Sequence, residues 1–149
     1  MFEKILVAVD GSEDSESAIR LANKLIAQGL GKTIVMIHVE PEFAVGTTDV
    51  LWAAGKTEGR NIEEIREIGE KLLEEACAIL EPGSAKVLKE FMVGNPSNVI
   101  CEYAKENKCD LVIMGSRGAS PLKGLLMGSV CQKVLHYAPC PVLITRAEW

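Results

Sequence analysis

The sequence predicts a doubly wound α/β fold, in which a five-stranded parallel sheet carries helices on both faces. Short apolar runs alternate with longer segments whose apolar residues recur every three or four positions, and this is the pattern of strands alternating with amphipathic helices. Several of the apolar runs show no alternation with polar residues, which is typical of strands buried on both faces of a parallel sheet. We count five strands and four helices, joined by right-handed crossovers.

The first strand and the first helix are both marked at their ends. Residues 4–9 (KILVAV) form an apolar run, and residues 10–12 (DGS) end it. Ser12 is a preferred N-cap residue, and the acidic residues that follow it suit the positive end of a helix. Apolar residues then recur at helical spacing until Gly29 or Gly31 stops the helix.

The middle of the chain contains one long segment without periodicity. Residues 33–39 (TIVMIHV) predict a second buried strand, whereas residues 40–56 show no period and are interpreted as a loop or an insertion. Apolar residues at helical spacing from about residue 57 to residue 80 predict a long amphipathic helix with an acidic solvated face. Residues 85–93 predict a third strand, and its mixed composition places it near an edge of the sheet.

The C-terminal part continues the alternation. The Asn-Pro pair at residues 95–96 is typical of a helix start, with Asn as N-cap and Pro in the first turn. Residues 110–114 (DLVIM) predict a fourth strand and residues 141–145 (PVLIT) a fifth, with a glycine-rich segment and a helix between them. Because no repeat, low-complexity tract or linker interrupts the pattern, we expect one domain that spans residues 1–149.

Composition excludes several classes of protein. The net charge of −5 argues against binding nucleic acid through a positive field. No apolar run approaches the roughly 18 residues of a membrane span. The start MFEKILVAVDGS lacks the basic and apolar regions of a signal peptide, and the five cysteines include no C-x-x-C pair. We therefore expect a cytoplasmic protein with reduced thiols and no membrane association.

The segment between the fourth strand and the last helix carries the strongest chemical signal. Gly115 and Gly118 come just after a buried strand, and Gly128 and Ser129 begin the next helix. Glycines let backbone amides approach phosphate oxygens, and a helix N-terminus adds positive potential. The Ser129 hydroxyl is a candidate either to cap the helix or to bond a phosphate.

The charges in the same region favour an anionic ligand. No acidic residue lies between Asp110 and Glu148. The basic residues in this interval are Arg117, Lys123, Lys133 and Arg146. A glycine-rich loop that holds Arg117 and Lys123 and no acid suits a triphosphate.

These motifs resemble those of the ATP-binding universal stress proteins. The spacing Gly115-x2-Gly118-x9-Gly128-Ser129 matches the G-x2-G-x9-G-[S/T] motif of that family at every position. The opening MFEKILVAVDGSEDSESAIRLA, the later segments IVMIHV, VGNPSNVI and DLVIMGSRG, and the closing GSVCQKVLHYAPCPVLIT are also similar to the family. The resemblance covers essentially the whole chain, and residues 40–56 are its least typical part.

The resemblance implies a set of ATP contacts. Asp10 would lie beside the adenosine and the phosphates, where it is a candidate ligand for Mg²⁺, and Val39 would offer its backbone to adenine. Met114 would stand at the entrance to the glycine segment. The residues around ribose and phosphates would be Gly115, Arg117, Gly118, Gly128, Ser129 and Val130.

The resemblance also implies the strand order 3-2-1-4-5 and a homodimer formed through the last strand. The residues themselves support a dimer, because Val142, Leu143 and Ile144 would otherwise form an apolar sheet edge. Such an edge promotes aggregation unless it is paired.

Some of these residues also have structural alternatives. Asp10 is a candidate cap for the first helix, and the glycines are candidates for tight turns. His38 and His136 have no cysteine or acid at a useful spacing, so we assign neither a catalytic nor a metal role.

Three functions remain open from the sequence. They are an ATP-binding switch in the stress response, a weak ATPase, and a nucleotide-independent interaction module. Phosphoryl transfer needs a positioned nucleophile, and we find no clear water-positioning residue, so binding with at most slow hydrolysis is favoured. The intact glycine spacing argues against the interaction module, while the choice between ATP and AMP stays open. A Walker P-loop is excluded because Lys123 precedes Gly124.

Overall fold

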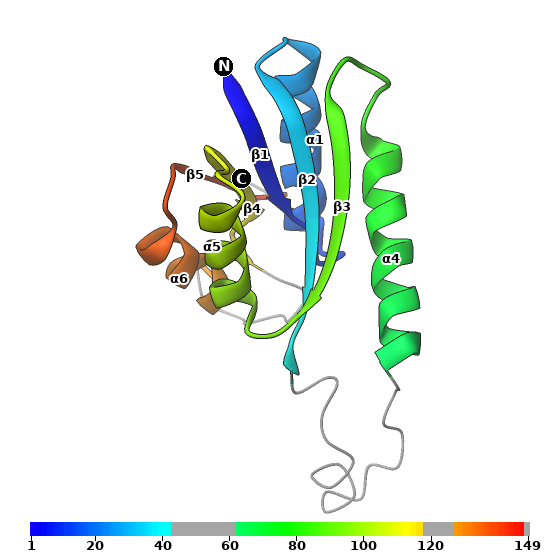
Figure 1. Ribbon diagram of the computed structural model, residues 1–149, viewed down its shortest axis with the longest axis vertical. Coiled ribbons are helices and arrows are strands. Elements are labelled where there is room, and N and C mark those ends of the chain that lie inside the picture. The colour runs from blue at the N-terminus through cyan, green and yellow to red at the C-terminus, as the bar shows by residue number, and fades with distance from the viewer. Residues whose placement is uncertain (43–61, 118–126, 148–149) are drawn as a thin grey trace, which may run out of the picture.

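The sheet has the predicted topology. The computed structural model describes residues 1–42, 62–117 and 127–147. Within these ranges, five strands form one parallel sheet in the order β3-β2-β1-β4-β5, accompanied by four helices (Figure 1). This confirms the predicted fold class and strand order. Residues 43–56 of the predicted insertion lie outside the described ranges.

The elements alternate along the chain as expected. They are β1 (Phe2–Ala8), α1 (Glu13–Ala27), β2 (Gly31–Glu40), α4 (Ile62–Ile79), β3 (Lys86–Val93), α5 (Pro96–Glu106), β4 (Leu111–Gly115), α6 (Ser129–Tyr137) and β5 (Val142–Thr145). Strand β3 is an edge strand, as its mixed composition predicted, and β5 is the other edge. None of the helices in the described ranges has both the length and the apolar character needed to cross a bilayer.

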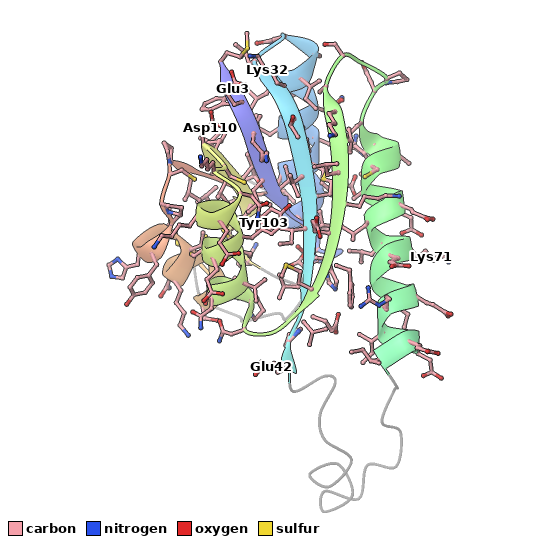
Figure 2. All side chains as sticks on the ribbon, in the orientation of Figure 1. Glu3, Lys32, Glu42, Lys71, Tyr103 and Asp110 are labelled. Atoms are coloured by element: carbon pink, nitrogen blue, oxygen red, sulfur yellow. The ribbon has the colours of Figure 1, made fainter. Side chains whose placement is uncertain are left out.

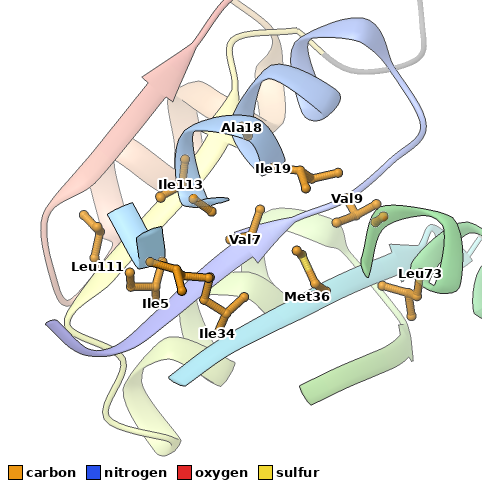
Figure 3. Close-up of a cluster of buried hydrophobic side chains, with 13 residues drawn as sticks. Ile5, Val7, Val9, Ala18, Ile19, Ile34, Met36, Leu73, Leu111 and Ile113 are labelled. Carbon is orange, nitrogen blue, oxygen red and sulfur yellow. The ribbon is translucent and has the colours of Figure 1, made fainter. Parts of the chain in front are cut away.

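Two hydrophobic cores lie on opposite faces of the sheet. Figure 3 shows the core beneath α1 and α4, which contains Ile5 and Val7 of β1 together with Ala18 of α1 and Leu73 of α4. Leu6 of β1 belongs instead to the second core, beneath α5 and α6. Because successive side chains of a strand point to opposite faces, β1 must be apolar at every position, and this explains its continuous apolar run.

The helix starts follow the predicted caps at α1 and α5. The Ser12 hydroxyl accepts a hydrogen bond from the Ser15 amide at 3.1 Å. At α5 the Asn95 side chain accepts from the Asn98 amide at 3.2 Å, and Pro96 is the first helical residue. These caps come shortly after β1 and β3. Because the two strands are parallel, both helix N-termini lie at the same end of the sheet.

Helix α6 begins differently. Gly128 is its N-cap residue, with no side-chain hydrogen bond, and Ser129 is already helical. This excludes the capping role for Ser129, whereas its role toward a ligand stays a prediction.

Polar contacts secure the amino ends of the strands. The Asp110 carboxylate accepts from the Glu3 and Lys4 amides at 2.8 and 2.9 Å, and Lys32 pairs with Glu3 at 2.7 Å. Figure 2 shows Glu3, Lys32 and Asp110 together at this end, with Glu42 at the far end of β2.

Candidate functional site

A cavity of about 610 Å³ opens at the carboxyl ends of the strands. Strands β1 and β4 are neighbours in the sheet, but β1 leads into α1 on one face and β4 leads toward α6 on the other. Sheets of this kind bind ligands where neighbouring strands lead to opposite faces, because the loops diverge there and leave a crevice. The cavity lies at that position, and its volume is typical of small-molecule sites.

Eight of the nine residues predicted for the site line this cavity. They are Asp10, Val39, Met114, Gly115, Arg117, Gly128, Ser129 and Val130. The ninth, Gly118, lies outside the described residues, as does Lys123. The structure therefore gathers residues from three distant parts of the chain, while their contact with a nucleotide stays a prediction.

Three helix N-termini border the cavity. Ser15 in the first turn of α1, Asn95 before α5, and Gly128 before α6 all line it. The first amides of a helix lack intrahelical partners and carry partial positive charge, so they attract anions. At α6 no side chain caps these amides, which leaves them open to a ligand oxygen.

Two cationic side chains add to this potential. Arg117 lines the cavity at the end of β4, and Lys133 lines it from α6. The sequence prediction gave Lys133 no role in the site. Its position four residues after Ser129 could have indicated one, because residues at this spacing lie on the same face of a helix.

One side of the cavity is apolar. Its lining includes Ile37 and Val39 of β2, Ile100 of α5, Met114 of β4 and Val130 of α6. The cavity thus combines an apolar wall with helix N-termini and cations, which suits a ligand that has a flat apolar ring and a charged polar tail.

Val39 directs its backbone groups toward the cavity. In a parallel sheet, successive residues of a strand bond to neighbours on opposite sides, so residues two apart bond to the same side. The Ile37 carbonyl accepts from the Val9 amide at 2.8 Å, so Val39 faces the same side as Ile37. Strand β1 has ended before this point, whereas β2 continues (Figure 1). In the described ranges, no backbone hydrogen bond joins Val39 to the residues that follow β1.

His38 has an acidic partner, contrary to the sequence prediction. Its Nδ1 lies 2.7 Å from the Val9 carbonyl oxygen, and its Nε2 lies 2.8 Å from Glu40 Oε2. Because a carbonyl oxygen can only accept, Nδ1 donates to Val9. The prediction was wrong because it did not apply strand geometry, in which residues two apart share a face.

Asp10 prepares the cap of α1 without being the cap. Its Oδ1 accepts hydrogen bonds from both the amide and the hydroxyl of Ser12, which in turn caps the helix. Its Oδ2 accepts no hydrogen bond from the part of the chain that the structure describes, and Asp10 lines the cavity. Over the same residues, no group of three or more potential metal ligands is assembled. Asp10 is therefore a single carboxylate available to a ligand.

Asp14, which the sequence prediction did not single out, ties the start of the glycine segment to the end of β5. Its Oδ2 accepts from the Ser116 hydroxyl at 2.9 Å and from the Arg117 amide at 3.2 Å, and its Oδ1 accepts from the Ala147 amide at 2.9 Å. Burial by itself would raise the pKa of Asp14, but these hydrogen bonds and the charge of Arg117 bring the pKa below its ordinary value. A buried charge therefore fixes the backbone of Arg117.

Gly115 has a packing role that the sequence argument did not include. A Cβ at this position would lie 2.7 Å from the Asp14 Cβ and 2.9 Å from the Ser15 amide nitrogen. The missing side chain allows α1 to pack directly against the end of β4, which brings the Asp14 carboxylate within reach of the glycine segment.

All five cysteines are free thiols in the structure. Burial raises the pKa of Cys109 and Cys131 to about 11, so both remain protonated at neutral pH. Cys131 also lines the cavity.

Comparison with known proteins gives a consistent assignment. The sequence model of the universal stress protein family matches residues 1–146. The chain is 36% identical to universal stress protein YxiE of Bacillus subtilis over 98% of this chain and 100% of that protein. Among solved structures, hypothetical protein MJ0577 of Methanocaldococcus jannaschii superimposes with a TM-score of 0.74 at 28% identity, over 97% of this chain and 96% of that one.

A more distant structure was solved with a ligand. A universal stress protein family protein from Arabidopsis thaliana with AMP bound superimposes with a TM-score of 0.62 at 20% identity. The match covers 96% of this chain and 90% of that chain. At this identity the likeness shows a shared fold.

Proposed function

Because this chain belongs to the universal stress protein family, we propose that its cavity binds an adenine nucleotide, with ATP as the preferred ligand. The protein then acts as a nucleotide-dependent switch in the stress response. The observation that carries the proposal is the convergence of three helix N-termini on one cavity that also has an apolar wall.

The two ends of the cavity suit the two ends of the ligand. Adenine is a flat apolar ring with a polar edge, and it fits against the apolar wall beside the open backbone groups of Val39. The phosphates fit the first amides of α6, at Ser129 and Val130, with Arg117 and Lys133 supplying positive charge. AMP bound by the Arabidopsis relative keeps AMP as the alternative ligand.

Asp10 is the residue we propose for Mg²⁺. Proteins often hold this ion through one or two carboxylates together with substrate phosphates, so a single carboxylate beside the phosphate end fits that chemistry. The ion would neutralise charge on the triphosphate.

We propose binding rather than efficient hydrolysis. The acidic side chains that line the cavity, within the described ranges, are Asp10 and Glu40. Glu40 is engaged with His38, and Asp10 is the carboxylate we assign to Mg²⁺, so neither is left to orient a water against a phosphate. Any ATPase activity would be slow.

We also propose that two copies pair through β5, and that the protein works in the cytoplasm, where its thiols stay reduced. Strand β5 is an edge of the sheet, and Leu143 on it is 40% exposed. Pairing with a second copy would satisfy the open edge.

Calorimetric titration of nucleotide-free protein with ATP, ADP and AMP, each with Mg²⁺, tests the proposal. We expect affinity to rise with the number of phosphates. Lys133→Met should lower ATP affinity about tenfold, the effect of losing one charge-assisted contact, and should change AMP affinity less. Lys71→Met is the matched control, because Lys71 is exposed on α4 (Figure 2) and does not line the cavity.

Two results would contradict the proposal. Folded protein that binds none of the three nucleotides would leave the fold intact but make the chain an interaction module. Equal losses in Lys133→Met and Lys71→Met would show that phosphates are not held at this end of the cavity.

A further inference from the structure

His38 occupies a hydrogen-bond acceptor that the sheet would otherwise use. The Val9 amide donates to the Ile37 carbonyl, so the next bond of a regular parallel ladder would run from the Val39 amide to the Val9 carbonyl. That carbonyl accepts instead from His38 Nδ1 at 2.7 Å. The imidazole therefore takes the place of the Val39 N–H group.

The ring is held in this position from several sides. Glu40 Oε2 lies 2.8 Å from Nε2, and only 12% of the His38 side chain is exposed. The centroid of the Phe91 ring lies 6.0 Å from the centroid of the His38 imidazole. A Cβ at Gly69 would come within 3.2 Å of His38 Cδ2, so α4 packs against the ring as well.

We infer that His38 is a positioning residue for base recognition. By occupying the Val9 carbonyl, it ends the β1–β2 ladder and leaves the Val39 N–H free to meet a ligand. This inference rests on the proposed function for the identity of the ligand, but the competition for the Val9 carbonyl is a property of the chain alone.

The backbone N–H and C=O of Val39 favour adenine through the order of donor and acceptor that they present. The pairing edge of adenine presents an acceptor, N1, beside a donor, the N6 amino group. An N–H and a C=O from one residue complement that edge. Guanine presents the reverse polarity at these two atoms, with O6 as acceptor and N1–H as donor, so it would meet like groups. Without His38, the Val39 N–H would bond to Val9 and the cavity would lose its donor to N1.

Amide hydrogen exchange of nucleotide-free protein tests the competition directly. We expect the Val39 amide to exchange at least about tenfold more slowly in His38→Leu than in the parent, because it gains a partner in the sheet. General destabilisation would speed exchange, so the direction separates positioning from a merely structural role. His38→Asn should keep the parent rate, because its amide nitrogen replaces Nδ1 as donor to Val9.

Titration of the same proteins tests the consequence for the ligand. His38→Leu should lose about tenfold in affinity for both ATP and adenosine, with no change for GTP, and His38→Asn should retain affinity. Unchanged or faster exchange of the Val39 amide in His38→Leu would overturn the inference even if ATP binds. If the parent binds no ATP while that exchange still slows, the competition is supported, but the proposed function and the adenine role are overturned.

Discussion

Asp14 shows how one residue connects parts of the chain that are far apart in sequence. Its carboxylate accepts hydrogen bonds from Ser116, Arg117 and Ala147, and its side chain is only 7% exposed. Thr145 donates to the Asp14 carbonyl at 3.0 Å, so the first turn of α1 holds β5 through backbone and side chain together. Loss of the charge should therefore affect the stability of the whole fold.

The lowered pKa of Asp14 makes this contribution depend on pH. Its folded pKa lies below the ordinary value of 3.8, so the stabilisation is complete above that value and is lost as pH falls through the lower folded pKa. We expect Asp14→Asn to cost about 2 kcal/mol at pH 7, typical of lost hydrogen bonds to a buried charge. The difference from the parent should shrink once the pH drops below 3.8.

Urea unfolding over a series of pH values measures this difference. Glu13→Gln is the control, because Glu13 is an exposed acid beside Asp14 in the same helix turn, and we expect its effect to stay within about 0.5 kcal/mol. A constant difference between Asp14→Asn and the parent from pH 7 to pH 3 would contradict the assignment.

Single residues were predictable from the sequence only where a fixed spacing marks them. Gly115, Gly128 and Ser129 belong to a motif, and the structure places all three at the cavity. Asp14 has no such mark. An acid in the first turn of a helix is ordinarily a solvated side chain, and only the tertiary fold brings its hydrogen-bond donors from residues more than 100 positions away.

At the scale of elements, a glycine inside α4 sets how closely that helix approaches the sheet. A Cβ at Gly69 would lie 2.3 Å from Phe91 Cε2, so alanine cannot fit without displacing the ring. Arg66 of the same helix lies over that ring at 5.2 Å, which adds to the contact. Helix propensity favours alanine over glycine by about 1 kcal/mol, and here packing opposes it.

We expect Gly69→Ala to destabilise the protein by about 1 to 3 kcal/mol. In a Phe91→Leu background the same substitution should be neutral or stabilising, because the smaller side chain leaves room for the methyl group. A double-mutant cycle measured by urea unfolding tests this coupling. Additive effects would show that Phe91 is not what excludes a side chain at position 69.

The existence and order of the elements were predictable, but their ends were less so. Strand β2 begins at Gly31, two residues before the predicted residue 33, because Gly31 pairs with Phe2 in the sheet. Pairing of this kind depends on a neighbouring strand, so local sequence does not determine it. Caps supplied by local side chains, such as Ser12 and Asn95, were predicted correctly for the opposite reason.

For the whole molecule, the sheet order leaves two edges that differ in their proposed role. Val87 on β3 and Leu143 on β5 are each 40% exposed. If the molecule dimerises through β5, Leu143→Lys should raise the dissociation constant at least about a hundredfold, because it places a charge in an apolar contact.

Val87→Lys is the matched control, since it adds the same charge at the same exposure on the opposite edge. Sedimentation equilibrium measures both variants and the parent. A parent that remains monomeric, or equal losses in the two variants, would contradict pairing through β5.

The fold class was the most predictable property of the whole molecule, because uninterrupted apolar strands and amphipathic helices are repeated along the chain. The position of the cavity could be predicted from the topology of the sheet, whereas some of the side chains that determine its chemistry could not. His38 with Glu40, and Lys133, required knowledge of which side chains share a face near the crevice.

The composition of the cavity also bears on how the protein is made. Its lining includes Asp10, which follows β1, together with Gly128 and with Ser129, Val130, Cys131 and Lys133 of α6. The Ser116 amide is in turn bonded to Thr145 in the final strand. The chain up to at least Lys133 must therefore have left the ribosome before any ligand can find a complete site. A ligand of this cavity cannot guide the early steps of folding during synthesis, and it acts instead by stabilising the finished molecule.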